Sequence, residues 1–450
     1  MTDRPSGHLA VVTIGVAVML SVLDGVMFNA TLPTIAARLD AKPADAIWVV
    51  NAYQLAAAIV LLPLGKAADI YGHKRVYLGC ITLFGLASVG CALAPSLVSL
   101  AAWRFVQGCG GAGIMGITNA MLRLVCPPER FGRGVARNSL LVALALAGGP
   151  GIASLVVTFA SWRWLFAVNV PVTLLLLFIG LRALPGGTHK HDRYDLVAAL
   201  LTMAMFGALL LSLDTGAHRA SLLAPLALAA GAVACGILLG RRQRGHESPL
   251  LPLDMLRARR FGLSVATMFA ASAAQLVAYV VLPFFFQRDL GRTQIETGLL
   301  FLPWPLALAV AAPMAGWLGD RLDSSRQCAL GAGLFALGLT LLAALGAGAT
   351  ITAIGWRMAL CGFGYGLFQP ANSRTLIMSA PAARLGSASV MGASARVMGQ
   401  ATGAAVAALL LGGAAGGLAG ALLVAAGFAA AAAGLSIFRG SQPLAARGSG

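Results

Sequence analysis

Long uncharged apolar runs alternate with short polar segments along the whole of this 450-residue chain. Most of the runs reach the roughly 20 apolar residues that a helix needs to cross about 30 Å of hydrocarbon. The pattern therefore predicts an all-α polytopic membrane protein with fourteen spans. Their ranges are 9–36, 46–66, 75–95, 97–125, 136–159, 164–183, 195–214, 222–240, 261–286, 296–318, 328–349, 351–377, 387–411 and 416–438.

The longest polar connections that follow the sixth and eighth spans isolate the seventh and eighth from the rest. They cover residues 183–194 and 241–260 and are rich in Arg, His and Pro. We therefore expect six spans, then two, then six. The predicted units are an N-terminal six-helix bundle at 1–183, two inserted spans with a basic linker at 184–260, a C-terminal six-helix bundle at 261–440 and a disordered tail at 441–450.

A short sequence recurs at the same place in the two predicted bundles. GKAADIYGHKR at 65–75 and GWLGDRLDSSR at 316–326 each carry a glycine, an aspartate four residues later and then basic residues. Parallel six-span repeats place a transport site near the midplane, between the halves. The recurrence therefore predicts two related bundles around a central cavity.

Composition and charge agree with a membrane protein and exclude some partners. The chain is 59% hydrophobic and 10% charged, whereas soluble domains are about one quarter charged. Most of its Lys and Arg fall in segments on the side of both termini, which predicts that both termini are cytoplasmic. We expect a bacterial-type cytoplasmic (inner) membrane, with basic clusters contacting anionic lipid. No folded basic domain is present to bind nucleic acid.

Two isolated charges lie deep in predicted spans. Asp24 is the only acid well inside the membrane, and Arg104 lies within the fourth span. A rise of about 1.5 Å per residue places them about 13 and 12 Å from the outer boundary, so they lie at matching levels. Charged residues at such depth usually face protein or water and carry function. A switchable Asp24–Arg104 pair is therefore a reasonable hypothesis.

Three motifs resemble those of the major facilitator superfamily. In the 65–75 loop, Gly65, Asp69, Gly72 and Lys74 match its loop motif, and a charge pair made there would latch the cytoplasmic side. WRFVQGCGGAG at 103–113 is similar to the fourth-span motif. LALAGGPGIAS at 144–154 resembles the antiporter motif of the fifth span. Gly149 and Pro150 match this fifth-span motif and are gating candidates. The second copy of the loop motif, at 316–326, supplies two further gating candidates, Asp320 and Arg321.

The stretches LDGVMFNATLP (23–33), SWRWLFAVNVP (161–171) and 366–405 resemble the fourteen-span drug–proton antiporter family. The resemblance implies alternating-access export of lipophilic, often cationic compounds in exchange for protons. It implies a monomer without a cofactor, driven by the proton gradient. It also assigns proton coupling to Asp24, with Arg104 as its partner.

A single deep acid limits the cargo that the cavity could attract. We expect a monovalent cation, a neutral lipophile or an amphiphile, with one proton per cycle. Trp48 and Trp103 are expected at the membrane interfaces. For Arg396 the sequence leaves two roles open, a structural contact between helices and a position in the cavity. The candidate cavity residues are Asn29, Tyr53, Gln54, Gln107, Gln275, Tyr279, Phe363, Phe368, Gln369 and Asn372.

Three classes of function compete with drug export: a lipid or metabolite exporter, an enzyme and a channel. An exporter or flippase of a lipid or amphiphilic metabolite would use the same fold and remains the alternative. An enzyme is disfavoured because the sequence has no HExxH, no Gly-x-Ser-x-Gly, no P-loop and no Cys/His cluster. A channel is disfavoured by the two-half layout.

Overall fold

The computed structural model describes residues 5–127, 131–186, 194–218, 223–243, 253–319, 321–346, 348–380, 385–412 and 417–440. Within these residues the chain forms helices joined by turns and contains no strand, which confirms the predicted all-α fold class. The predicted tail at 441–450 and the gating candidate Asp320 lie outside the described residues.

The helices follow the predicted spans. The first group is α1 (Pro5–Arg38), α2 (Pro43–Tyr71), α3 (His73–Leu93), α4 (Leu97–Val125), α5 (Phe131–Phe159), α6 (Trp164–Ala167) and α7 (Asn169–Ala183), followed by α8 (Leu196–His218) and α9 (Leu223–Arg242). After the turn η2 (Leu253–Arg257) come α10 (Arg259–Phe284), η3 (Phe285–Asp289), α11 (Gln294–Phe301), α12 (Pro303–Gly319), α13 (Ser324–Ala343), α14 (Ile351–Met378), α15 (Leu385–Gly412) and α16 (Gly417–Gly440).

Among the described residues, eleven helical segments are long and apolar enough to cross a membrane. The helices α4 and α14, which carry arginines, are not among them, and the apolar part of α8 is shorter. The segments α6 with α7, α10 with η3 and α11 with α12 each count as one span. Fourteen crossings therefore remain a prediction, while the multi-pass architecture is established.

Local chemistry explains several helix ends. Ser96 and Ser99 form a reciprocal capping box at the start of α4, and Thr293 and Glu296 form another at the start of α11. Gly72 has a φ of 97°, which side chains other than glycine rarely adopt, and it joins the end of α2 to the start of α3. The turn in the sequence motif thus needs glycine at this position.

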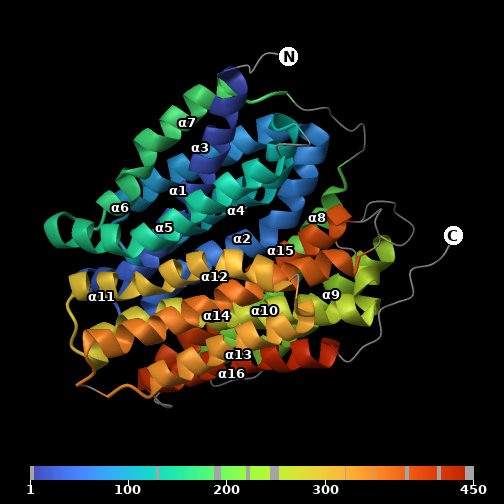
Figure 1. Ribbon diagram of the computed structural model, residues 1–450. Helices are drawn as coiled ribbons and strands as arrows, with labels where there is room; N and C mark the ends of the chain where they lie inside the picture. Colours follow the sequence, from blue (N-terminus) through green and yellow to red (C-terminus); the bar gives the residue numbers. More distant parts are fainter. Residues whose placement is uncertain are drawn as a thin grey trace.

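The same packing pairs occur in both halves of the molecule (Figure 1). The pairs α1–α5, α2–α4, α3–α4, α3–α7 and α1–α7 recur as α10–α15, α12–α14, α13–α14, α13–α16 and α10–α16. Two six-helix bundles related as parallel repeats follow from this correspondence. They meet along a seam where α1, α2 and α5 contact α10, α11, α12 and α15.

The two inserted helices pack against each other at this seam. Helix α8 contacts α9, and it also contacts α2 of the first bundle and α15 of the second. The Asp195 carboxylate accepts a hydrogen bond from the backbone N–H of Ala198 and a charged pair of bonds from Arg242 at the end of α9. The insert is therefore a hairpin that bridges the two halves.

Candidate functional site

Asp24 lies in a buried polar cluster inside the N-terminal bundle. Its Oδ2 accepts a hydrogen bond from Nη1 of Arg104 at 2.5 Å, and its Oδ1 accepts bonds from Asn169 Nδ2 at 2.7 Å and Gln107 Nε2 at 3.1 Å. The Asp24 and Arg104 side chains are each 1% exposed. Every donor comes from the same bundle, from α4 and α7, so the carboxylate does not face the other half.

The Arg104 guanidinium is enclosed by aromatic rings. Its Cζ lies 4.5 Å from the ring centre of Tyr53, 4.6 Å from that of Phe28 and 5.8 Å from that of Phe166. Such cation–π contacts stabilise a desolvated cation. A Cβ on Gly108 would lie 2.5 Å from the carbonyl oxygen of Tyr53, so glycine is needed where α4 approaches α2. The fourth-span glycines thereby bring Arg104 over the Tyr53 ring.

Ser88 and Asn169 complete the cluster and were not among the predicted site residues. Ser88 Oγ accepts a bond from Gln107 Nε2 at 2.8 Å and is 0% exposed. Gln107 also accepts a bond from Arg104 at 2.7 Å, which closes a ring of hydrogen bonds around the carboxylate. Asn169 belongs to the SWRWLFAVNVP stretch, so that motif carried the signal for it.

Gln294 joins the two halves at the end of the molecule where α1 ends and α11 begins. This end is called the α1–α11 end, and the predicted topology places it outside the cell. Its Oε1 accepts a bond from Thr34 at 2.6 Å. Its Nε2 donates to the carbonyl of Ala30 at 3.1 Å and to Ser154 Oγ at 3.4 Å. Gln294 was not among the predicted site residues. Its bonds to α1 and α5 close this end.

Gly149 and Pro150 lie at the same contact. A Cβ on Gly149 would lie 3.1 Å from Val26 of α1, and one on Gly298 of α11 would lie 2.8 Å from the Pro150 carbonyl. Helix α5 runs through Pro150 without interruption. The fifth-span motif therefore provides close packing between α1, α5 and α11.

The loop-motif residues contact their own half. Lys74 Nζ donates to the Leu181 carbonyl near the end of α7 at 2.8 Å, a favourable place for a cation at a helix C-terminus. Asp69 lies 3.2 Å from His73 and is about half exposed. Gly65 is half-buried with open space around it. Their proposed gating role stays a prediction.

In the described part of the second loop-motif copy, the charged residues Arg321, Asp323 and Arg326 are exposed, while Ser325 is buried. The Arg321 guanidinium lies 4.1 Å from the ring centre of Trp317 on α12. Asp323 begins α13 and accepts a bond from the backbone N–H of Ser325. Any latch formed by Arg321 also remains a prediction.

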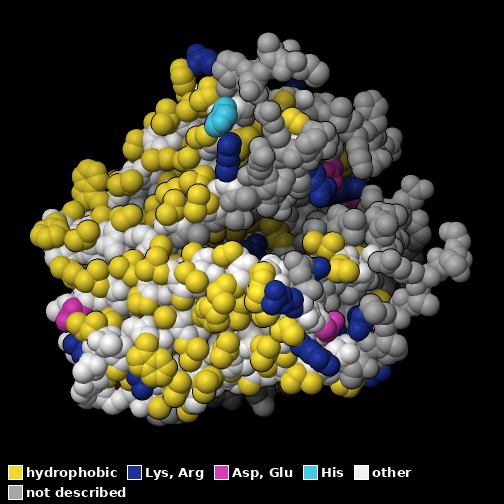
Figure 2. All heavy atoms as spheres, viewed as in Figure 1, with side chains coloured by type: hydrophobic (Ala, Val, Ile, Leu, Met, Phe, Trp, Pro, Cys, Tyr) yellow, Lys and Arg dark blue, Asp and Glu magenta, His cyan; other side chains and the backbone are white. Residues whose placement is uncertain are grey.

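The predicted cavity residues divide into two groups. Three of them are at most 1% exposed, and each packs inside its own bundle: Gln107 in the first, and Phe368 and Asn372 in the second. Gln275 is buried as well, and Phe363 packs with apolar residues of α12, α13 and α14. The residues that stay half-buried are Asn29, Tyr53, Gln54, Tyr279, Phe363 and Gln369. The space-filling view has a hollow on the seam with a Lys or Arg side chain inside it (Figure 2).

A second buried arginine, Arg439, ties together four helices of the C-terminal bundle. It is 0% exposed, and its Nη1 donates to Asn372 Oδ1 at 2.6 Å and to Ser264 Oγ at 2.9 Å. Its Nε donates to Ser325 at 3.3 Å. The cluster pins α10, α13, α14 and α16, so Asn372 serves this bundle rather than the cavity.

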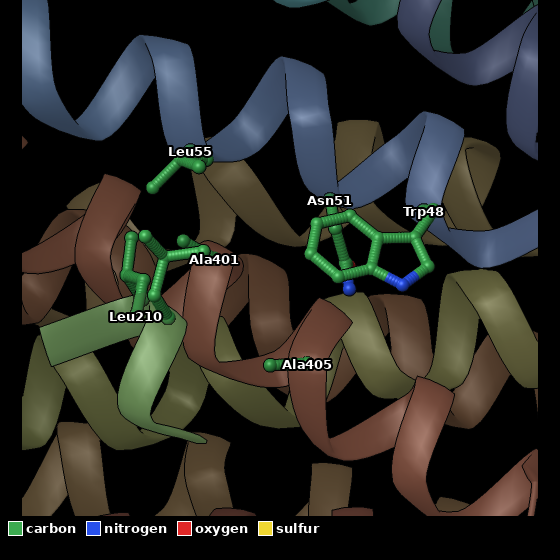
Figure 3. Close-up of a pocket in the computed structure, with 7 residues that line it drawn as sticks. Trp48, Asn51, Leu55, Leu210, Ala401 and Ala405 are labelled. Atoms are coloured by element: carbon green, nitrogen blue, oxygen red, sulfur yellow. The ribbon is translucent and has the colours of Figure 1, made fainter. Parts of the chain in front are cut away.

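A small pocket lies where α2, α8 and α15 meet (Figure 3). Asn51 is 8% exposed, and neither of its amide atoms has a hydrogen-bond partner within the described residues. Trp48 lies beside it, and Ala401 and Ala405 form the opposite wall. The cavity volume of about 20 Å³ is enough for one water molecule. Trp48 thus packs at the seam, while Trp103 is 41% exposed.

Comparison with known proteins identifies the family. The family model of the Major Facilitator Superfamily matches residues 14–404 and also 263–449. The chain belongs to the major facilitator superfamily. Its relatives in the superfamily include the uncharacterized transporter YebQ of Escherichia coli K12, 43% identical over 86% of this chain and 85% of YebQ. They also include the multidrug resistance protein Stp of Mycobacterium tuberculosis, 28% identical over 85% of this chain and 71% of Stp.

A third superfamily relative is the putative multidrug resistance protein MdtD of Escherichia coli, 31% identical over 68% of this chain and 65% of MdtD. Solved structures support the major-facilitator fold. The peptide transporter PepTSo aligns with a TM-score of 0.71 at 13% identity, over 95% of this chain and 97% of that one. A bacterial homologue of the lysosomal transporter Spinster, solved inward-facing and unoccupied, aligns with a TM-score of 0.64 over 97% and 96%.

Proposed function

We propose that this chain is a proton-coupled antiporter that exports lipophilic compounds across the cytoplasmic membrane by alternating access. The observation that carries the proposal is the buried Asp24–Arg104 pair inside a major-facilitator fold. The resemblance to Stp and MdtD, both named for multidrug resistance, supports drug export as the activity.

Protonation of Asp24 would act through Arg104. The neutral carboxyl group loses the charge-assisted bond to the guanidinium, which is roughly twice as strong as a neutral hydrogen bond. Arg104 is then a buried cation without a counter-ion, a costly arrangement. Relief requires either a shift of α1 relative to α4 or access of water. Either change biases the equilibrium between the conformations of the carrier.

The aromatic contact of Arg104 provides a route from this pair to the seam. Arg104 packs on Tyr53 of α2, and the Tyr53 hydroxyl is 3.2 Å from Ser21 Oγ of α1. Helix α2 in turn packs against α15 of the other bundle. A change in the Asp24–Arg104 pair would therefore act directly on α2, a helix that would move relative to the other bundle when the carrier changes conformation.

Proteoliposome transport with an imposed pH gradient tests the proposal. Three fluorescent probes, neutral N-phenyl-naphthylamine, anionic anilinonaphthalene sulfonate and cationic ethidium, are compared while a trapped dye follows protons. We expect the wild type to move protons with at least one probe, and Asp24→Asn to transport that probe only down its own gradient. Asp195→Asn, which changes an acid near the end of a span, is the control. Uphill transport by Asp24→Asn would overturn the mechanism.

A further inference from the structure

Arg396 is a half-buried cation on α15, one of the helices of the seam. Within the described residues its guanidinium forms no hydrogen bond, ion pair or ring contact. Arginine stays charged at any physiological pH. Leaving such a charge partly desolvated without a counter-charge costs free energy unless a ligand supplies the counter-charge. The residue therefore needs an explanation that the Asp24 cluster does not supply.

The position of Arg396 on α15 places it on the seam. Between Met391 and Ala405 of α15, the residues that keep partial exposure are Ala393, Arg396, Val397 and Gln400, which lie on one face at the i, i+3, i+4, i+7 spacing. Helix α15 contacts α2 of the other bundle, and the seam is hollow in the space-filling view (Figure 2).

Neighbouring residues of α15 show which helices surround Arg396. A Cβ on Gly399 would lie 2.3 Å from the Phe269 carbonyl of α10, and one on Gly403 would lie 2.5 Å from the Ala273 carbonyl. Ala401 and Ala405 face α2 and α8 across the small pocket (Figure 3). Gly399 and Gly403 follow Arg396 by three and seven residues, so Arg396 lies on the α10 side of α15, between two helices of the seam.

The groups beside Arg396 are also hydrogen-bond donors. The Tyr365 hydroxyl interacts electrostatically with Arg396 and lies close to Ser272. Ser272 Oγ is buried and has no hydrogen-bond partner among the described residues. Asp24, the deep acid, is held by Arg104, Gln107 and Asn169 in the other bundle. The groups named beside Arg396 are two hydroxyls and no carboxylate, a set that is suited to an anion.

We propose that Arg396, with Tyr365 and Ser272, binds the acidic group of an amphiphilic anion in the central hollow, and that the exported substrates include lipophilic carboxylates, sulfonates or phosphates. This inference rests on the proposed export function and names its substrate class. It reverses the charge expected from the sequence, because the enclosed Asp24 carboxylate offers a cation no exposed surface.

Exchange of a monoanion for a proton also has a distinct electrical signature. An anion that leaves while a proton enters moves two positive charge equivalents inward per cycle. A neutral substrate moves one, and a monovalent cation moves none. An inside-negative potential therefore accelerates anion export most.

A matched pair of probes tests the site by equilibrium binding. Anilinonaphthalene sulfonate and N-phenyl-naphthylamine share their ring system and differ by the sulfonate, and both fluoresce in apolar surroundings. We expect the wild type in nanodiscs to bind the sulfonate more tightly. Arg396→Gln should weaken sulfonate binding about ten-fold or more and leave the neutral probe unchanged, since bonds to charged groups are the stronger ones. Arg396→Lys should retain part of the preference.

The controls separate this site from the proton mechanism. Arg357→Gln removes another half-buried arginine of the C-terminal bundle and should bind both probes as the wild type does. Asp24→Asn should change the affinity for both probes by the same factor and keep the preference for the sulfonate, so failure of coupling and failure of this site are distinguishable. Competition by lysophosphatidylglycerol but not lysophosphatidylcholine would identify a lipid as a source of the anion. Unchanged sulfonate binding by a folded Arg396→Gln, or no preference in the wild type, would overturn the proposal.

Discussion

The Arg104 guanidinium lies 2.5 Å from the Asp24 carboxylate, and both side chains are almost completely buried. Their contact joins α1 to α4 across 80 residues of sequence. Removing one member of a buried ion pair typically costs about 3–5 kcal/mol, because the other charge is left unpaired. The pair therefore has a consequence for stability as well as for coupling.

Arg104→Ala should be strongly destabilised, by about 3–5 kcal/mol. The double variant Asp24→Asn with Arg104→Gln should unfold at a higher temperature than Arg104→Ala, because no unpaired charge remains in the bundle. Thermal unfolding in detergent measures both. The single variants Asp24→Asn and Arg104→Gln complete the comparison. If the double variant loses at least as much stability as these two single variants lose in sum, the pair is not coupled as the geometry implies.

Gln294→Leu should loosen the α1–α11 end. The substitution removes the bonds to Thr34, Ala30 and Ser154, while leaving a side chain of similar size. We expect the distance between spin labels on Arg38 and Gly291 to broaden toward longer values. Gln287→Leu, which removes one bond within the same bundle, is the matched control. An unchanged distance distribution would contradict the closing role of Gln294.

Asn51→Leu should stabilise the conformation described here. The amide is buried and has no hydrogen-bond partner in the part of the chain that the structure describes, and replacing an unsatisfied polar group by an apolar one of similar shape gains about 1–3 kcal/mol. The transition temperature should rise, while Asn51→Ala, which enlarges the pocket, should not raise it. A lower transition temperature for Asn51→Leu would indicate that a bound water satisfies the amide.

The Asp195–Arg242 pair predicts a small acid sensitivity of the inserted hairpin. The hydrogen bond from Arg242 holds the pKa of the Asp195 carboxyl below its usual value of 3.8. Because this pKa is lower in the folded chain, the stability is present at neutral pH and lost as the pH falls through the folded-state value. Both groups are partly exposed, so the effect should be small and screened by salt.

Thermal unfolding between neutral and acidic pH checks this expectation. The wild type should lose slightly more stability below about pH 4 than Asp195→Asn, and the difference should shrink in high salt. Parallel curves at low salt would show that the pair contributes nothing measurable.

The hydrophobic pattern predicted most of the architecture, because the apolar runs that cross a membrane are long and uninterrupted. It also singled out Asp24 and Arg104, since isolated charges stand out in apolar helices and the helical rise fixes their depth. The direction of a side chain around its helix was not predictable in the same way. Gln107 and Asn372 looked like cavity residues, yet neighbouring helices enclose them.

Arg439 illustrates another limit of the sequence. A basic residue at the end of an apolar run normally reaches water, so nothing in the pattern marks it as buried. In the folded chain, Ser264, Ser325 and Asn372 come from three other helices and enclose its guanidinium. Such a site arises only from residues distant in sequence. Its partners can be found only when the packing is known.

The inserted hairpin limits how the two bundles can move. Helix α8 contacts both α2 and α15, which belong to the two bundles that would separate and close in the proposed alternating access. A single helix cannot stay fixed to two bodies that rotate against each other, so it must slide on one of them. A disulfide between α8 and the bundle on which it slides would arrest the cycle, whereas one to the bundle that carries it would not. The inserted hairpin would then limit how far the two bundles can rotate against each other.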